Sequence, residues 1–466
     1  MNMSRLQARI PQAKELAARI RREPFAFGIC GVTLAAAGVI LLAGGNLLAN
    51  AQGSGNSAPR SSSEVAGSTV ARDGETLQVT MDLGNVLVHT QDSGKVDYRV
   101  HLQTNAPPRE AKSLFSRFHI QESQTRDEIR LRGQAGPERI GGGLWVTLEL
   151  NIPQNMNLDV TTGGGNIQVD DIHGRVMLTT AGGNLVTGNV TGAAHLHTDG
   201  GHISVKNIGG ELVAETGGGH ITAGDVGGGA ILHTNGGHIR VTSVEGAAKL
   251  ETGGGNVTVE HAGADLVADT QGGQIDVGEA QGVVRAKTEG GGIRVVHVTG
   301  PTNLQTSNGS IYLTRVDSSV RAWTEAGGIT AWIVQPTGTR STCDLQSKDG
   351  DIVVYMPPEL SATIDAEIQL GERHRLIVDP ALPIKVNYGE TTSGTRTVRA
   401  EGALNGGGEV FRLRTVAGNI RLIAIDSAKQ LEMYRQQMEQ LQQKLQIQIQ
   451  QLQQVQRDDR QDDSRK

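Results

Sequence analysis

The feature that most constrains the fold of this chain is a repeat with a period of 18 residues. Each copy carries a motif close to Thr-x-Gly-Gly-x-Ile, and its threonine is Thr162, Thr180, Thr198, Thr216, Thr234, Thr252, Thr270, Thr288, Thr306 or Thr324. Looser copies follow at Ser347 and Thr415, and an earlier copy begins at Met81. A fixed period of this length is typical of solenoids and related repeat architectures.

Each 18-residue unit contains two short stretches in which apolar and polar residues alternate. In the unit that starts at Thr234, the first stretch includes Ile239 and Val241, and the second includes Ala248 and Leu250. Alternation with a period of two predicts β-strands with one buried face. Glycines stand at the two corners between the strands, where we expect a positive φ that bulkier residues resist.

One such unit cannot bury its apolar side alone, but a stack of units can. We therefore predict an all-β fold, a parallel β-solenoid with an 18-residue coil whose strands pair with their equivalents in the next coil at about 4.8 Å. The number of faces stays open, because Ile208, Val226 and Val244 could form a short third side. Two other folds are excluded. A calcium-binding nonapeptide roll needs Gly-Gly-x-Gly-x-Asp, which "GGHIRV" lacks, and an outer-membrane barrel needs lipid-facing aromatic girdles, which this sequence does not show.

Composition narrows the range of partners. The 63 glycines are close to twice the usual share of about 7 %, while aromatic residues make up only 3 % of the chain. Few aromatic rings argue against a sugar-binding cleft. The net charge is −6 with no basic block outside the N-terminus, so we expect no nucleic-acid partner. Cys30 and Cys343 lie too far apart to form a metal or redox motif.

The N-terminus predicts a place outside the cytoplasm for most of the chain. Residues 1–24 are basic and are expected to stay in the cytoplasm, and residues 25–49 are apolar and long enough for a transmembrane helix. The alternative is a signal peptide cleaved near Ala51. We therefore expect either a single-pass protein of the inner (cytoplasmic) membrane with its bulk in the periplasm or extracellular space, or a secreted protein.

Less regular segments flank the repeats. Residues 50–68 are a Ser/Gly-rich linker, and residues 69–160 are expected to be irregular strands, with a polar and helical excursion in "PREAKSLFSRFHIQESQTRDE", that cap the N-terminal end. The regular solenoid spans residues 161–334, and residues 335–426 are expected to form the C-terminal cap. Caps are needed because an exposed terminal coil is an open sheet edge.

The last segment changes to a heptad pattern. Residues 427–458 contain no glycine or proline and predict a coiled-coil helix, followed by a disordered tail at 459–466. We expect a homo-oligomer through this helix, either dimer or trimer; the alternative is one amphipathic helix docked on the solenoid end. The a positions are Leu431, Met438, Leu445 and Leu452, and the d positions are Tyr434, Leu441, Gln448 and Val455.

The whole layout resembles the putative-adhesin family of bacterial β-strand repeat proteins. The resemblance rests on "LELNIPQNMNLDVTTGGGNIQV", on the repeats that follow, and on "GGGEVFRLRTVAGNIRLIAI", and it covers roughly residues 69–426. It implies an extracytoplasmic β-solenoid of unknown biochemical function. The family ascribes no catalytic residues, so the resemblance implies none here.

Histidines recur at two outward positions of the repeat and are the candidate metal ligands. His202, His220 and His238 stand four residues after the motif threonine, and His197 and His233 stand just before it. Imidazoles on a rigid scaffold could bind Zn²⁺ or Cu²⁺. The same positions also accept Asn, Gln and Glu, which favours a polar surface ladder with no cofactor.

These observations favour a membrane-anchored, non-enzymatic, adhesin-like scaffold of the cell envelope, with an envelope protein or a surface glycan as its ligand. One alternative is a β-helix enzyme acting on polysaccharide, but such enzymes carry their machinery on long loops, and the repeats have no insertions. A metal-binding envelope protein that uses the histidine ladder is the other alternative.

Overall fold

The computed structural model describes residues 61–135, 143–333, 342–389 and 396–425. The predicted basic segment 1–24, transmembrane segment 25–49, coiled-coil segment 427–458 and tail 459–466 lie outside the described residues, as do residues 50–60 of the predicted linker. The prediction is wrong for the rest of the linker, because residues 61–68 lie in strand β1 (Ser61–Val70). Within the described ranges, no helix is long and apolar enough to cross a membrane.

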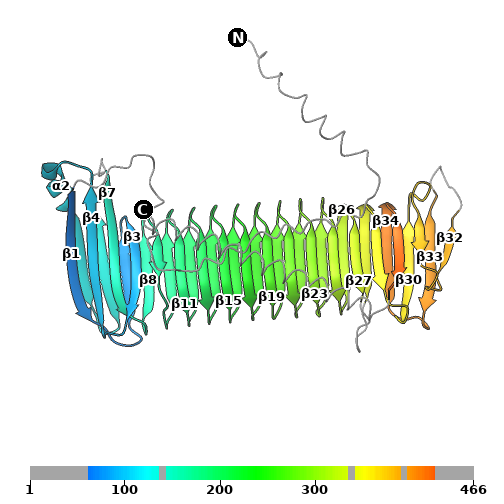
Figure 1. Cartoon of the computed structure of the whole chain (residues 1–466), viewed down its shortest axis with the longest axis horizontal. Helices are drawn as coiled ribbons and strands as arrows, with labels where there is room; N and C mark the ends of the chain where they lie inside the picture. The colour runs from blue at the N-terminus through cyan, green and yellow to red at the C-terminus, as the bar shows by residue number, and fades with distance from the viewer. Residues whose placement is uncertain (1–60, 136–142, 334–341, 390–395, 426–466) are drawn as a thin grey trace, which may run out of the picture. The chain divides into compact units, whose positions relative to one another are not determined.

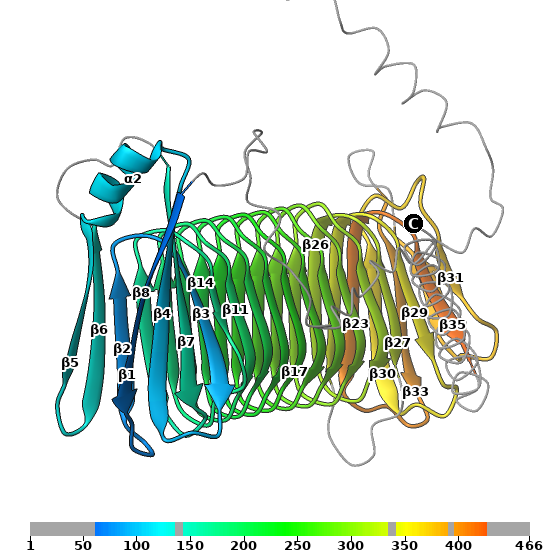
Figure 2. The same ribbon diagram turned by 60° about the vertical axis from the view of Figure 1, so that its left-hand side comes forward.

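The described residues form two long β-sheets that lie face to face, with the strands running across the long axis (Figures 1 and 2). We name them sheet A and sheet B. Apolar side chains from the inner faces of both sheets form one continuous buried cluster. The fold is therefore all-β, and its repeated parallel strands in two sheets are consistent with the predicted β-solenoid.

The chain alternates between the two sheets through the repeats. The strands of sheet A are β9 (Ile167–Val169), β11 (Leu185–Val190), β13 (Ile203–Ile208), β15 (Ile221–Val226), β17 (Ile239–Val244), β19 (Val257–Ala262), β21 (Ile275–Ala280), β23 (Ile293–Val298), β25 (Ile311–Val316) and β27 (Ile329–Ile333). The strands of sheet B are β8 (Asn157–Thr162), β10 (Val176–Thr180), β12 (Ala194–Thr198), β14 (Leu212–Thr216), β16 (Ala230–Thr234), β18 (Ala248–Thr252), β20 (Leu266–Thr270), β22 (Val284–Thr288), β24 (Thr302–Thr306) and β26 (Val320–Ala326).

Strand pairing follows the sequence period. Ile203 pairs with Ile221 in sheet A, and Leu212 pairs with Ala230 in sheet B, both in parallel and both 18 residues apart. Ile208, Val226 and Val244, which the sequence left open as a third side, are the buried last residues of sheet A strands. One coil of the solenoid, called a rung below, therefore contributes one strand to each sheet.

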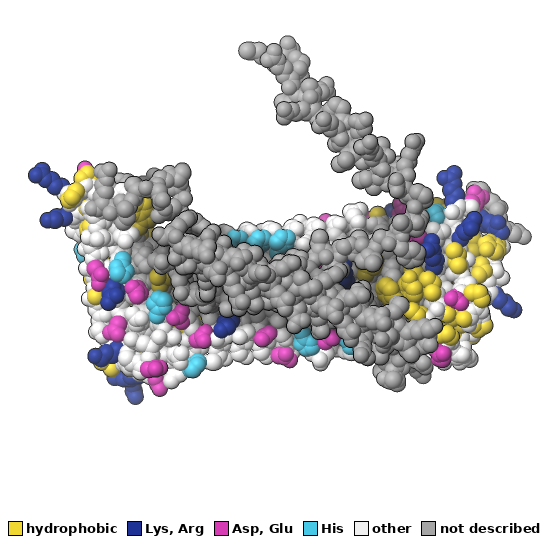
Figure 3. Space-filling view, in the orientation of Figure 1, with side chains coloured by type: hydrophobic (Ala, Val, Ile, Leu, Met, Phe, Trp, Pro, Cys, Tyr) yellow, Lys and Arg dark blue, Asp and Glu magenta, His cyan; other side chains and the backbone are white. Residues whose placement is uncertain are grey.

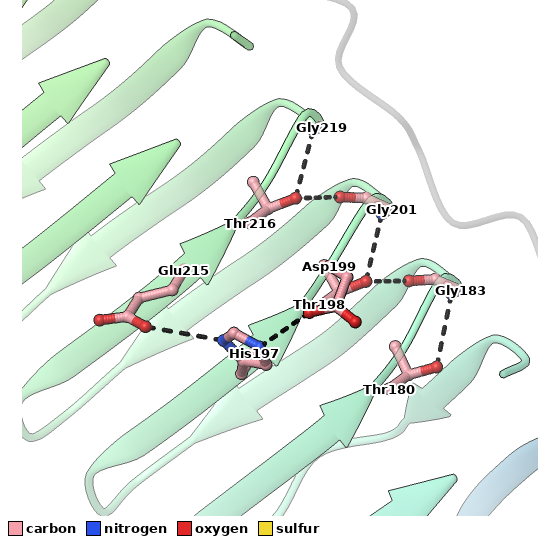
Figure 4. Close-up of polar contacts among 9 residues, drawn as sticks. All are labelled: Thr180, Gly183, His197, Thr198, Asp199, Gly201, Glu215, Thr216 and Gly219. Carbon is pink, nitrogen blue, oxygen red and sulfur yellow. Dashed lines mark hydrogen bonds and ion pairs between the residues drawn. The ribbon is translucent and has the colours of Figure 1, made fainter. Parts of the chain in front are cut away.

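The motif threonine joins each rung to the one before it (Figure 4). Thr198 is fully buried, and its Oγ1 donates a hydrogen bond to the carbonyl of Gly183 at 2.8 Å and accepts one from the amide of Gly201 at 3.1 Å. The looser copies do the same: Ser347 donates to Gly327 and Thr415 to Gly350. The hydroxyl therefore satisfies buried backbone groups at a corner where no strand ladder can do so.

The expected reason for glycine at the corners is wrong. None of the glycines in the regular repeats from Thr162 to Thr324 adopts a positive φ; among the described glycines, Gly74, Gly84, Gly406 and Gly407 do, and Gly84 belongs to the earlier copy at Met81. At Gly201, an added Cβ would lie 1.9 Å from the carbonyl oxygen of Gly183, and at Gly246 it would lie 2.7 Å from the carbonyl carbon of Gly228. Close approach between successive rungs, and not backbone handedness, therefore excludes a side chain at positions 201 and 246, whereas a Cβ added at Gly200 would meet nothing within 4 Å.

Antiparallel strands extend both sheets at the N-terminal end. In sheet A, β1 pairs with β4, β4 with β7, and β7 in parallel with β3; in sheet B, β5 pairs with β6 and β6 in parallel with β2. The predicted helical excursion is a helix only over α2 (Pro108–Phe115), and its remainder is strand β5. The bounds are β1 (Ser61–Val70), β2 (Thr76–Met81), β3 (Asn85–Gln91), β4 (Lys95–Thr104), β5 (Phe118–Gln124), β6 (Glu128–Ala135) and β7 (Leu144–Pro153).

The C-terminal end is built in a similar way. Sheet A ends with β29, β35 and β31, all parallel, and sheet B ends with β28, β34 and β30, followed by the antiparallel strands β33 and β32. Figure 1 shows these strands at the end opposite to β1. The bounds are β28 (Cys343–Asp349), β29 (Ile352–Met356), β30 (Ala362–Ile368), β31 (Leu376–Val378), β32 (Lys385–Tyr388), β33 (Val398–Leu404), β34 (Val410–Ala417) and β35 (Ile420–Ala424).

Candidate functional site

Three of the predicted site residues lie in one continuous row at a corner of the solenoid. In this corner ladder, the side chain on each rung accepts a hydrogen bond from the backbone amide of the equivalent residue on the next rung. The amide of His220 donates to Nδ1 of His202 at 2.9 Å, and the amide of His238 donates to Nδ1 of His220 at 2.8 Å. The ladder consists of Asn85, Asn166, Asn184, His202, His220, His238, Asn256 and Gln274.

The ladder fixes the chemistry of its imidazoles. The rings stack at 4.9 Å between centroids, with His220 between His202 and His238. A ring nitrogen that accepts an N–H bond carries no proton, so the proton of each neutral ring is on Nε2, which is then a donor. Burial lowers the pKa of His220, and the neighbouring imidazoles of His202 and His238 lower it further. The stack therefore favours neutral histidine.

The other two predicted site residues lie in a separate row on the outer face of sheet B. His197, Glu215, His233 and Glu251 occupy equivalent positions on four consecutive strands. His197 Nδ1 lies 3.6 Å from Glu215, and its Nε2 lies 3.3 Å from Asp199 (Figure 4). This row alternates basic and acidic groups, which is a favourable arrangement for cross-strand neighbours.

At the acidic end of this row, the carboxyl group of Asp269 has a raised pKa. Asp269 follows Glu251 on the next strand, and Lys287 follows Asp269. Burial raises the pKa of Asp269, and the negative charge of Glu251 raises it further. Lys249 contacts Glu251 at 2.8 Å and partly balances the two carboxylates. These charges are spread along the sheet and do not converge on one point.

The structure does not bring the five histidines together as ligands. His197 and His233 are separated by the strand of Glu215, which is two strand spacings or roughly 9.6 Å. In the corner ladder each Nδ1 is already occupied by a backbone amide. Among the described residues, no group of three or more His, Cys, Asp or Glu side chains is placed to hold a metal ion. What the histidines can do is hold one rung to the next.

A second ladder lies near the ends of the sheet A strands β11, β13 and β15 and was not predicted from the sequence. Asp171 accepts hydrogen bonds from the amide of Asn189 at 2.7 Å and from its Nδ2 at 2.8 Å. Asn207 Nδ2 donates to Asn189, and the amide of Asp225 donates to Asn207. The amide of Asn189 lowers the pKa of Asp171. The 18-residue spacing of these four residues was a visible signal in the sequence, and the hydrogen bonds show that Asp171 helps to hold successive rungs together.

The three tryptophans lie on different surfaces. Trp145 is exposed on β7 near the N-terminal end, where a hollow of about 650 Å³ is lined by Asn105, Leu114 and Trp145 among others. Trp323 is on the outer face of sheet B. Trp332 is on the outer face of sheet A, where its ring stacks on Tyr355 at 4.7 Å. The tryptophans therefore do not share a groove.

Comparison with known proteins gives partial structural likenesses. No protein-family model and no curated protein matches the sequence. A putative adhesin from Bacteroides fragilis is 13 % identical with a TM-score of 0.25, covering 54 % of this chain and 96 % of its own. A putative adhesin from Parabacteroides distasonis is 12 % identical with a TM-score of 0.29, covering 58 % of this chain and 97 % of its own.

A third solved structure has a different name. It is a putative lipid binding protein from Parabacteroides distasonis, 14 % identical with a TM-score of 0.27, covering 57 % of this chain and 94 % of its own. Two of the three structures carry the name putative adhesin, which is also the name of the family that the sequence resembles. Identities and TM-scores this low give no information on what the chain binds.

Proposed function

We propose that this protein is a membrane-anchored, non-enzymatic scaffold of the bacterial cell envelope that presents a long repeated surface to an envelope protein or a surface glycan. The observation that carries the proposal is the regularity of the outward side chains. In both ladders and in the row on sheet B, equivalent residues repeat from rung to rung and bond to each other or to backbone groups. Such a surface suits a repetitive ligand, because one contact can be made many times along the solenoid.

The membrane part of the proposal rests on residues 1–49. A basic segment followed by an apolar run is the pattern of a single-pass anchor whose C-terminal part leaves the cytoplasm. The test is the intact mass of the protein isolated from membranes, together with protease treatment of spheroplasts. A full-length mass and digestion of the solenoid from outside support the anchor. A mass that begins at residue 52 in the soluble fraction would replace it with a secreted protein.

The scaffold part is tested against the polysaccharide-enzyme alternative. The full-length protein is incubated with a panel of envelope polysaccharides, and both binding and the release of new reducing ends are measured. We expect retention of at least one polysaccharide, or of an envelope protein, without release of reducing ends. Release of reducing ends that grows with time and protein concentration contradicts the proposal.

A further inference from the structure

The outer face of sheet A becomes apolar at its C-terminal end. Trp332 on β27 pairs with Tyr355 on β29, and Tyr355 pairs with Ile423 on β35, so three large side chains form one row across three strands. Figure 3 shows hydrophobic side chains gathered at this end of the face in view. Tyr312 is 46 % exposed and Ile377 is 48 % exposed. We call this surface the end patch; its residues are Tyr312, Trp332, Val353, Tyr355, Ile377 and Ile423.

The same face is polar along the middle of the solenoid. The strand position of Tyr312 and Val353 is occupied on earlier strands by Thr222, Arg240, Thr258, Asp276 and Arg294. On the last strands this position holds the apolar residues Tyr312, Val353 and Ile377, with Thr330 and Arg421 between them. The end patch is therefore a cluster of apolar side chains interrupted by these two polar ones, and a cluster of exposed apolar side chains favours an interaction site.

The geometry of the aromatic rings favours an apolar partner over a sugar. The rings of Trp332 and Tyr355 are stacked with an interplanar angle of 6°, so the facing sides of the two rings are occupied by each other. Two of the four faces of these rings are therefore closed to a sugar, which stacks on an aromatic face, whereas aliphatic side chains can pack against the ring edges and against Val353 and Ile423.

We propose that the end patch is covered by residues 427–458 of the same chain, docked as an amphipathic helix on the outer face of sheet A. The described chain ends at Ile425, directly after β35, the strand that places Ile423 in the patch. The amide of Ile425 bonds to Met356 at 3.0 Å, so the chain leaves the sheet beside Tyr355. A segment attached two residues away is present at an effective concentration on the order of millimolar or above.

The lengths also agree. The patch crosses the five strands β25, β27, β29, β35 and β31, which are four spacings or roughly 19 Å from first to last at about 4.8 Å each. A helix covers that distance in about 13 residues at 1.5 Å each. The first half of the heptad segment, residues 427–442, is long enough and carries the apolar residues Leu431, Tyr434, Met438 and Leu441.

This inference does not depend on the proposed function. It means that the apolar a and d residues of segment 427–458 pack against the chain's own sheet and not against the same segment of a second chain. A coiled coil buries the a and d residues only after two chains meet, and it leaves the end patch open. Docking on the chain's own patch buries both apolar surfaces in one molecule. The two arrangements predict different masses in solution.

The first experiment uses Trp332 as a reporter in the full-length protein in detergent. Trp145 and Trp323 are changed to phenylalanine, and acrylamide quenching is compared between this background, a Leu431→Asp/Met438→Asp variant and a Gln436→Asp/Gln443→Asp control. We expect the quenching of Trp332 to rise about twofold in Leu431→Asp/Met438→Asp and to stay unchanged in the control, because only the first variant should undock the segment and expose the indole. Sedimentation of the background protein should give a monomer.

The second experiment changes the patch itself. Val353→Lys should speed tryptic cleavage after Arg435 and Lys444, while Thr258→Lys, at the equivalent position in the middle of sheet A, should leave it unchanged. The proposal is overturned if Leu431→Asp/Met438→Asp does not change the quenching of Trp332 and Val353→Lys does not change tryptic cleavage. It is also overturned if the background protein sediments as an oligomer. In that case, unchanged quenching in Leu431→Asp/Met438→Asp would mean that the segment forms a coiled coil, and increased quenching would mean that it docks on a second copy.

Discussion

Replacing one motif threonine by valine tests whether the buried hydroxyl holds the rungs together. Thr234 is fully buried, and its Oγ1 donates to the carbonyl of Gly219 at 2.8 Å and accepts from the amide of Gly237 at 3.1 Å. Valine has nearly the same shape but can make neither bond. Thr234→Val therefore leaves a buried carbonyl and a buried amide without partners at a corner.

The expected cost follows from these two groups. A buried donor or acceptor that loses its partner costs about 1–3 kcal/mol, so the pair should cost about 2–6 kcal/mol. Thr234→Ser is the matched control, since it keeps the hydroxyl and removes one methyl group, for about 1 kcal/mol. The difference between the two variants isolates the hydrogen bonds from the packing.

Hydrogen exchange is the suitable measurement, because a solenoid can open rung by rung without unfolding as a whole. Exchange of amides in residues 230–256 should be about 30-fold faster or more in Thr234→Val and about fivefold faster in Thr234→Ser, at 1.4 kcal/mol for each factor of ten. Amides several rungs away should not change. If valine and serine accelerate exchange equally, the hydroxyl does not stabilise the corner and the reasoning is refuted.

Three further predictions concern the core and the corner ladder. Val241→Asp should lower the free energy of unfolding by several kcal/mol because the side chain is fully buried, whereas Arg240→Asp, on the outer face, should cost under about 0.5 kcal/mol; equal losses in melting temperature would contradict the assignment of faces. Because the pKa of His220 is lowered in the folded state, the unfolded state takes up a proton at a higher pH than the folded state does. Stability should therefore fall as the pH decreases below the ordinary histidine pKa of about 6.5. It should fall less in a His202→Asn/His220→Asn/His238→Asn variant, and identical pH profiles of the two proteins would refute the role of the ladder. In titration calorimetry with Zn²⁺ or Cu²⁺, the wild-type protein should give no more heat than this triple variant, and a larger stoichiometric heat would show a metal site.

The repeat predicted the strands well because two signals agreed at every unit. The alternation of apolar residues fixed which side of each strand is buried, and the 18-residue period fixed the pairing register, as Ile203 opposite Ile221 shows. The looser copies at Ser347 and Thr415 were also recognisable, and both donate the same corner hydrogen bond as the regular threonines. A period read from sequence is therefore sufficient to place neighbours across the solenoid.

The sequence did not correctly predict why particular residues, such as glycine and histidine, occupy particular positions of the repeat. Glycine at position 201 was attributed to a positive φ, but the conflict is with the carbonyl of Gly183 on the preceding rung, which only coordinates reveal. The grouping of His197 with His233 could have been rejected from sequence, because two 18-residue periods separate them by two strand spacings. The direction of the His220 Nδ1 atom toward a backbone amide could not have been found without the structure.

The corner ladder explains why its position can hold either asparagine or histidine. In both residues the acceptor, Oδ1 or Nδ1, is bonded directly to Cγ, so it reaches the same backbone amide on the next rung. Gln274 has one more methylene group, and its side-chain amide instead donates to Asp276 on its own strand at 2.8 Å. The position thus selects the reach of an acceptor atom and not the chemistry of an imidazole. A histidine that fits for this reason contributes to stability only while Nδ1 is unprotonated, so the same atom that makes histidine resemble a metal ligand is the one the fold already uses.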